Sequence, residues 1–157
     1  MKSKSSWREK VNRITETELV VIPEKMQLRF GRGMMLIPRP LDIEKLIGTI
    51  RKGRLITKSE LRRKLAADAG ADVACPLTTG IFLRMVSEAA EEELASGKKK
   101  IAPYWRVVGD KGELNEKISG GTELQAKRLM AEGFEVVQKK RGGIFLVGDF
   151  EKKLTAL

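Results

Sequence analysis

Apolar residues at helical spacing between positions 43 and 94 constrain the fold more than any other feature. Ile43, Leu46, Ile47 and Ile50 follow the i, i+3, i+4, i+7 pattern and predict one face of a short helix. The segment Arg51-Lys52-Gly53 then ends it, with cations in the last turn and a glycine beyond.

Two further helices follow this one closely. Thr57-x-x-Glu60 predicts a capping box, so a second helix begins here, carries a basic outer face and ends before Gly70. Residues 70–77 form a connection, and Thr78 or Thr79 then caps a third helix that Ser96-Gly97 ends. We expect its buried face to consist of Ile81, Phe82, Met85, Val86, Ala89, Ala90 and Leu94.

The C-terminal third mixes short strands with one more helix. Residues 104–108 are expected to be extended, and Thr122-x-x-Gln125 predicts a second capping box for a helix that reaches Gly133. Residues 135–137 and 144–147 flank the basic segment 139–143 and predict a hairpin with a basic tip. The predicted fold is therefore mainly α with small β, a winged helix-turn-helix.

The same patterns predict three parts of the chain. Residues 1–37 are an N-terminal extension with an extended segment at Glu18–Pro23 and a basic turn at Phe30–Gly33. Residues 38–148 form the winged-helix domain, and residues 149–157 a C-terminal tail.

Charge indicates the class of partner. The 157 residues hold 31 lysines and arginines against 21 acidic residues, a net charge of +10. Such an excess favours a polyanion, with nucleic acid first and an anionic membrane surface second. The plainer alternative is a basic protein with no polyanionic partner.

The scarcity of nucleophiles and metal ligands excludes several chemistries. There is one cysteine, Cys75, and no histidine. A Ser-His or Cys-His pair and a His-containing zinc site are therefore excluded, and we expect no metal and no cofactor. One cysteine forms no internal disulfide, and the sequence has no secretion signal and no apolar run of about 20 residues, so we expect a cytoplasmic protein without a membrane partner.

Several motifs, in order, resemble one known family. The segment from Pro103 to Gly112, then Ser119-Gly120-Gly121 and Leu129-x-x-Glu132-Gly133, is similar to the active-site region of the O6-alkylguanine-DNA alkyltransferases. Gly53 to Thr57 resembles the family's entry into its helix-turn-helix. The resemblance covers roughly residues 40–140 and implies the family's DNA-binding fold.

The resemblance also shows a decisive departure. The family's methyl-accepting cysteine aligns with Tyr104, and its neighbouring histidine with Trp105. A phenol without a histidine base is a poor nucleophile, so the chain resembles the non-catalytic, alkyltransferase-like proteins, which bind a flipped alkylguanine without repairing it. By this resemblance Tyr104, Trp105 and Ser119 surround a lesion pocket, with one aromatic ring facing it and the other in the core. Glu132, which pairs with the histidine in the family, is expected to lose that role.

The resemblance also suggests how DNA is held. Arg84 aligns with the arginine that fills the gap left by a flipped base; the plainer interpretation is a solvated helix arginine. Lys58 replaces a tyrosine that aids flipping, and Glu88 and Glu91–Glu93 confine DNA to the first half of the third helix. The expected DNA-binding residues are Lys58, Arg62, Arg63, Thr78, Thr79, Arg84 and Arg106.

Three functions remain open from the sequence. The first is a non-catalytic protein that binds double-stranded DNA, recognises O6-alkylguanine by base flipping and signals to DNA-repair proteins. The second is an alkyltransferase that uses Cys75, although this residue lies outside the matched motifs and fits a small buried residue better. The third is a general winged-helix nucleic-acid binder or adaptor without lesion preference.

Overall fold

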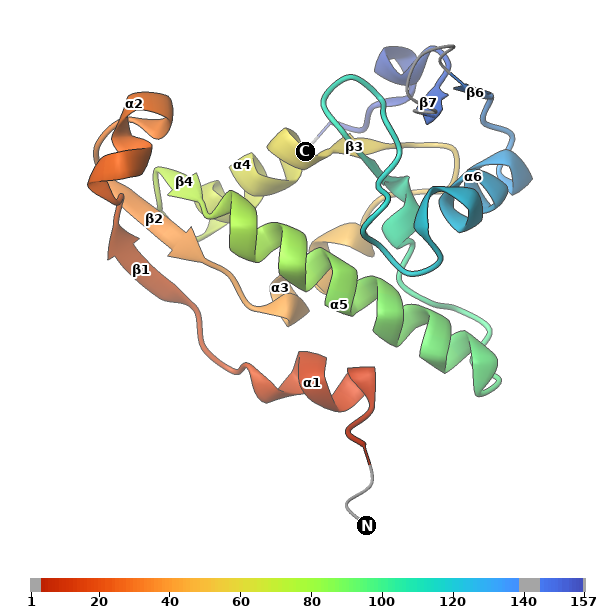
Figure 1. Cartoon of the computed structure of the whole chain (residues 1–157), viewed down its shortest axis with the longest axis horizontal. Coiled ribbons are helices and arrows are strands. Elements are labelled where there is room, and N and C mark those ends of the chain that lie inside the picture. The colour runs from red at the N-terminus through yellow and green to blue at the C-terminus, as the bar shows by residue number, and fades with distance from the viewer. Residues whose placement is uncertain (1–3, 139–144, 157) are drawn as a thin grey trace.

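The computed structural model describes residues 4–138 and 145–156. Its longest element, α5 (Pro76–Ala95), crosses the middle of the molecule in Figure 1 and packs against α3 (Pro40–Ile47) and α1 (Trp7–Arg13). The main core joins α3, α4 (Lys58–Asp68), α5 and Tyr104. The prediction of a mainly α fold with small β is confirmed.

The N-terminal part adds a small sheet to the start of α5. Strand β1 (Glu18–Val21) pairs antiparallel with β2 (Met34–Ile37), and β2 pairs parallel with β4 (Val73–Ala74), which runs directly into α5. A turn made of η1 (Glu24–Met26) and α2 (Gln27–Phe30) joins β1 to β2. The extended segment predicted at Glu18–Pro23 is thus confirmed by β1.

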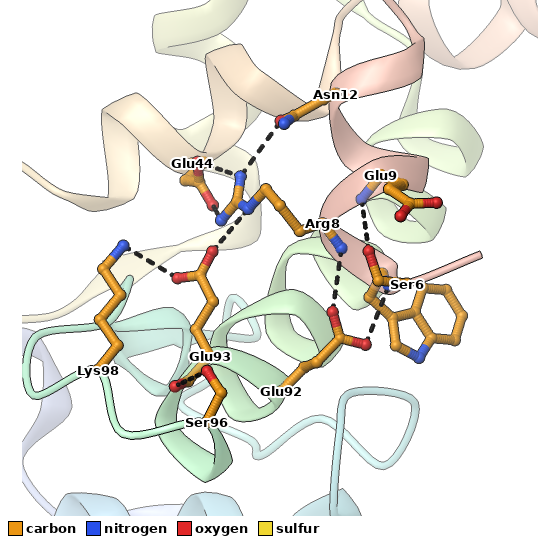
Figure 2. A network of polar contacts seen from close by, with 10 residues as sticks. Ser6, Arg8, Glu9, Asn12, Glu44, Glu92, Glu93, Ser96 and Lys98 are labelled. Atoms are coloured by element: carbon orange, nitrogen blue, oxygen red, sulfur yellow. Dashed lines mark hydrogen bonds and ion pairs between the residues drawn. The ribbon is translucent and has the colours of Figure 1, made fainter. Parts of the chain in front are cut away.

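Helix α1 is held in place by carboxylates from distant parts of the chain. The backbone N–H groups of Trp7 and Arg8 donate to Glu92 on α5, at 3.1 and 3.3 Å. The guanidinium of Arg8 contacts Glu44 of α3 and Glu93 of α5, each at 2.6 Å, as Figure 2 shows. The first helix of the chain is therefore fastened to both helices beneath it.

The two helices of the predicted helix-turn-helix begin differently. Helix α4 starts after Thr57, whose hydroxyl accepts the N–H of Glu60 at 3.2 Å, as the sequence predicts. Helix α5 starts at Pro76, so the prediction that Thr78 or Thr79 caps it is wrong. A proline at the first helical position has its φ preset for the helix and needs no N–H partner there.

The extended part of the segment after α5 is shorter than predicted. Residues Tyr104–Arg106 form a 3-10 turn, η2, and only β5 (Val107–Val108) is a strand, paired parallel with β3 (Ile56–Thr57). This pairing brings the turn after α5 against the start of α4.

Helix α6 (Gly121–Ala131) begins after Gly120, not at a Thr122 cap. Gly120 has φ +74°, and a side chain there would collide with Leu124. Gln125 is wholly buried and, instead of closing a capping box, accepts the N–H of Asn115 at 2.7 Å and donates to the carbonyl of Val107 at 3.0 Å. The second predicted capping box is therefore wrong, because the glutamine holds the preceding loop.

The chain ends in a hairpin and a short turn. Strands β6 (Val136–Gln138) and β7 (Phe145–Val147) pair antiparallel, which confirms the predicted hairpin; its basic tip, 139–143, lies outside the described residues. The final turn η3 (Phe150–Lys153) leads to Leu154, which bridges to Leu55. In the part of the chain that the structure describes, no helix is long and apolar enough to cross a membrane.

Candidate nucleic-acid interface

A hollow of about 790 Å³ opens between α4, the first half of α5 and the loop before α6. It brings together four residues predicted to bind DNA, which are Lys58, Arg62, Thr79 and Arg84. Its apolar lining includes Leu61, Leu83 and Ile118, and Asn115, Glu116 and Lys117 contribute from the loop. We call this cavity the α4–α5 hollow.

Cations outnumber acidic residues in the α4–α5 hollow: Lys58, Arg62, Arg84 and Lys117 line it, against Glu88 and Glu116. Burial lowers the pKa of Lys58, and the nearby charges of Lys117 and Arg62 lower it further, while the carboxylates of Glu113 and Asp110 oppose them. The lysine therefore sits in an environment that lacks an adequate counter-charge. A phosphate oxygen would supply that charge.

Neighbouring arginines on α4 have different surroundings. Arg62 lines the hollow and donates to the Ser59 hydroxyl at 3.2 Å. Arg63 does not line it; its guanidinium pairs with Glu60 at 3.0 Å on the exposed side of the helix. Helical geometry thus separates two residues that the sequence grouped together.

Arg84 lies on the exposed surface of α5, and its guanidinium carbon is 5.8 Å from the ring centre of Trp7. Nothing in the sequence indicated this contact, because it depends on where α1 packs. Of the two threonines, Thr78 donates its hydroxyl to Cys75 at 3.3 Å. Thr79 is 4% exposed, and its hydroxyl has no partner among the described residues.

Tyr104 does not face a cavity. Its side chain is 0% exposed, and its hydroxyl donates to Glu91 at 2.6 Å, a carboxylate that also binds Arg128. Burial, and then the Glu91 hydrogen bond, raise the pKa of the phenol far above its usual value. Of the two rings expected at the lesion pocket, Tyr104 is therefore the one that lies in the core, because α5 extends to Ala95 and its Glu91 accepts the phenol hydrogen bond.

Trp105 and Arg106 share one carboxylate, that of Glu132. The indole Nε1 donates to it at 2.5 Å and the guanidinium at 2.9 Å, while Arg106 also donates to the carbonyl of Ile50 at 2.6 Å. Burial alone would raise the pKa of Glu132, but the hydrogen bonds from Arg106, Trp105 and the Gly53 amide outweigh it and lower the pKa. The expectation that Glu132 has no partner at position 105 is thus wrong.

Arg106 is correspondingly removed from the surface, since its side chain is 13% exposed and that of Glu132 is 8% exposed. The prediction that Arg106 binds DNA is contradicted by this burial, because its donors are already used inside the protein.

The remaining residues of the expected lesion pocket are dispersed. Trp105 lines a different hollow, beyond the C-terminal end of α5, whose lining includes Lys99 and Lys100. Ser119 is buried, and its N–H donates to the Ser87 hydroxyl at 2.9 Å. Tyr104, Trp105 and Ser119 therefore do not enclose one cavity.

Cys75 is buried at the start of α5 in an apolar cluster with Ile22 and Met35. It is 7% exposed and lies on β4's continuation into α5, remote in sequence from the segment around Tyr104. This placement fits a packing residue.

The arrangement of helices and short strands is similar to that of alkyltransferase-like proteins. Two solved structures share it. One is S. pombe Atl1 in complex with damaged DNA containing O6-carboxymethylguanine, at 18% identity and a TM-score of 0.56. The other is S. pombe ATL in complex with DNA, at 16% identity and a TM-score of 0.55. Each similarity covers 75% of this chain and 94% of the other.

At such identities the similarity concerns the fold. No protein-family model matches the sequence, and no curated protein matches it.

Proposed function

We propose that this protein binds double-stranded DNA without transferring an alkyl group, and that the α4–α5 hollow is its contact surface. The observation that carries the proposal is the convergence of Lys58, Arg62, Arg84 and Lys117, from three separate elements, on one hollow. The backbone phosphates supply most of the affinity of DNA-binding proteins, and clustered cations on one face are their electrostatic signature.

Two further observations support a DNA partner. The net charge of +10 favours a polyanion over a neutral partner. The S. pombe proteins that share the fold are solved in complex with DNA. Hollow, charge and fold thus favour the same class of ligand.

The groups available argue against alkyl transfer. The Tyr104 phenol is buried with a raised pKa, and the indole nitrogen of Trp105 is a donor that cannot take its proton. Cys75 is buried and packs in an apolar cluster. A binding protein therefore fits these residues better than an enzyme does.

A preference for alkylated guanine is the finer proposal, and the α4–α5 hollow is the site for it. Its volume of about 790 Å³ lies within the range of ligand pockets, and the apolar side chains of Leu61, Leu83 and Ile118 suit the face of a base. Arg84 at its rim is placed to enter the gap that an extruded base leaves. In this proposal the bound lesion in turn recruits DNA-repair proteins.

The test is a titration of guanine and O6-methylguanine duplexes at several salt concentrations. We expect tighter binding at low salt, and weaker binding with a smaller salt slope for Arg62→Gln. Arg63→Gln is the matched control, one residue along the same helix but outside the hollow, and should bind like the wild type. Equal losses in the two variants would reject the hollow as the contact surface.

Lesion preference and catalysis have separate readouts. Tighter binding of the O6-methylguanine duplex, reduced more by Arg84→Ala than general binding is, would support base extrusion; equal affinity for both duplexes would favour the general nucleic-acid binder. A duplex with a labelled O6-methyl group should leave the protein unlabelled. Stable label that Cys75→Ser abolishes would instead establish an enzyme.

A further inference from the structure

The turn between β1 and β2, residues 24–33, is basic and has a fully exposed apolar tip. Leu28 on α2 is 100% exposed, more than any other large hydrophobic residue described. Lys25, Arg29 and Arg32 are exposed around it, and Glu24 is the one acidic residue of the segment. Among the described residues, none of these three cations forms an ion pair with a carboxylate. We call residues 24–33 the basic turn.

The basic turn is anchored firmly. The N–H of Ile22 donates to the carbonyl of Gly33 at 2.9 Å, which closes its base, and the Gln27 side chain donates to the carbonyl of Ile22 at 3.2 Å. Met26 and Phe30 pack inward against the apolar cluster that contains Cys75. Leu28 is therefore exposed on a turn whose other large apolar side chains are partly buried against the protein.

The anchor places the basic turn near the start of α5. Cys75 immediately precedes Pro76, the first residue of α5, and Pro76 and Leu77 line the α4–α5 hollow. In Figure 1, α2 lies at the same end of the molecule as β4 and the start of α5. The basic turn and the first residues of α5 that line the hollow therefore lie at the same end of the molecule.

We propose that the basic turn is a second DNA-contact element, in which Leu28 inserts between base steps from the minor groove while Lys25, Arg29 and Arg32 hold the flanking phosphates. An apolar wedge flanked by cations is a recurrent way to kink a duplex and enlarge its contact with protein. This inference rests on the proposed DNA-binding function and extends its footprint beyond the hollow.

DNA fits the basic turn better than a lipid surface does. Within residues 24–33, Leu28 is the one exposed large apolar side chain described, not the broad apolar face that interfacial helices present. Binding to an anionic membrane is therefore an outcome for the experiment to exclude.

The experiment compares two variants with the wild type on the same duplex. Leu28→Ala should reduce the DNA bend, measured by energy transfer between dyes on the duplex ends, and weaken binding by about tenfold, because it removes the apolar wedge. The triple variant Lys25→Gln, Arg29→Gln, Arg32→Gln should lower the slope of log affinity against log salt by about 0.9 for each phosphate that the protein no longer neutralises.

The matched control removes as many charges elsewhere, by Lys99→Gln, Lys100→Gln and Lys127→Gln, which are exposed beyond the other end of α5 and on α6. This control should keep the wild-type bend and reduce the salt slope less than the triple variant does. Circular dichroism confirms folding, which exposed positions should not disturb.

The outcomes separate the two proposals. If both turn variants keep the wild-type affinity, bend and salt slope while Arg62→Gln binds more weakly, the proposal for the basic turn is overturned. The proposal for the hollow then stands. No binding of DNA by the wild type would overturn both. Leu28-dependent binding to phosphatidylserine vesicles, with DNA binding unaffected by Leu28→Ala, would assign the basic turn to membranes.

Discussion

The indole of Trp105 donates its hydrogen bond to the buried carboxylate of Glu132 at 2.5 Å. The sequence resemblance aligns Trp105 with a histidine of the alkyltransferases. Glu132 therefore meets an indole at the position where that family has an imidazole. An indole N–H holds the carboxylate as a histidine would, but it cannot exchange a proton. The hydrogen bond between position 105 and Glu132 is thus present, but the indole at position 105 cannot act as a base.

Removing the Glu132 charge should destabilise the fold strongly. We expect Glu132→Gln to lower the free energy of unfolding at pH 7 by about 3–5 kcal/mol, because it leaves Arg106 buried without a counter-charge. Urea unfolding measures this. Glu60→Gln, in the exposed pair with Arg63, should cost much less.

The same variant has a predictable pH dependence. The pKa of Glu132 is lowered in the folded protein, so its stabilisation is present above the unfolded value of about 4.5 and is lost as pH falls through the folded pKa. The stability difference between the wild type and Glu132→Gln should therefore shrink on acidification. A difference that stays constant down to about pH 3 would contradict the buried ion pair.

Restoring the alkyltransferase motif should not restore the reaction. We expect Tyr104→Cys combined with Trp105→His to accept no label from an O6-methylguanine duplex, because the side chain at position 104 faces Glu91 and lies outside the α4–α5 hollow. Mass spectrometry of the intact protein checks this. A stable methyl adduct would show that the base reaches position 104.

As pH rises, DNA affinity should begin to fall at a lower pH than it would for a lysine with an ordinary pKa. Burial lowers the pKa of Lys58, so the free protein loses this charge below the usual value of 10.5, and a phosphate favours the charged form. Lys58→Arg should keep its affinity to higher pH, whereas coincident profiles for the two proteins would exclude phosphate contact by Lys58. The lowered pKa has the opposite effect on folding, which should gain stability as pH rises.

Trp7 should report DNA binding by its fluorescence. Its ring lies 5.8 Å from the Arg84 guanidinium, and an arginine that turns into DNA must leave it. We expect a change in tryptophan emission on titration with duplex, and no such change in Trp7→Phe, which retains Trp105. An emission spectrum unaltered at saturating DNA would indicate that Arg84 stays beside Trp7.

Local signals in the sequence were sufficient for part of this fold. The cap at Thr57 depends on one hydroxyl and an amide three residues later, and it forms as predicted. Thr122-x-x-Gln125 has equally good spacing and forms no cap, because Gln125 finds buried partners 10 and 18 residues away. A capping motif therefore predicts a helix start only where tertiary contacts offer its side chains nothing stronger.

Less of the candidate site than of the fold could be predicted from the sequence. Lys58, Arg62 and Arg84 line one hollow, but Ile81, assigned to the buried face of α5, is 51% exposed. The burial of Tyr104 could not be predicted from its place in the motif, because sequence similarity cannot show that Glu91 accepts its hydrogen bond. The direction in which the Tyr104 side chain points depends on the Glu91 carboxylate, which belongs to another element, α5.

The capping of α1 by Glu92 has a consequence for biosynthesis. A seven-residue helix is too short to persist by itself, and the carboxylate that receives its first amides lies 85 residues further along the chain. Helix α1 must therefore wait, without fixed structure, until the 85 residues that separate Trp7 from Glu92 have emerged from the ribosome. Helix α1 is therefore synthesised before Glu92 but acquires fixed structure only after it.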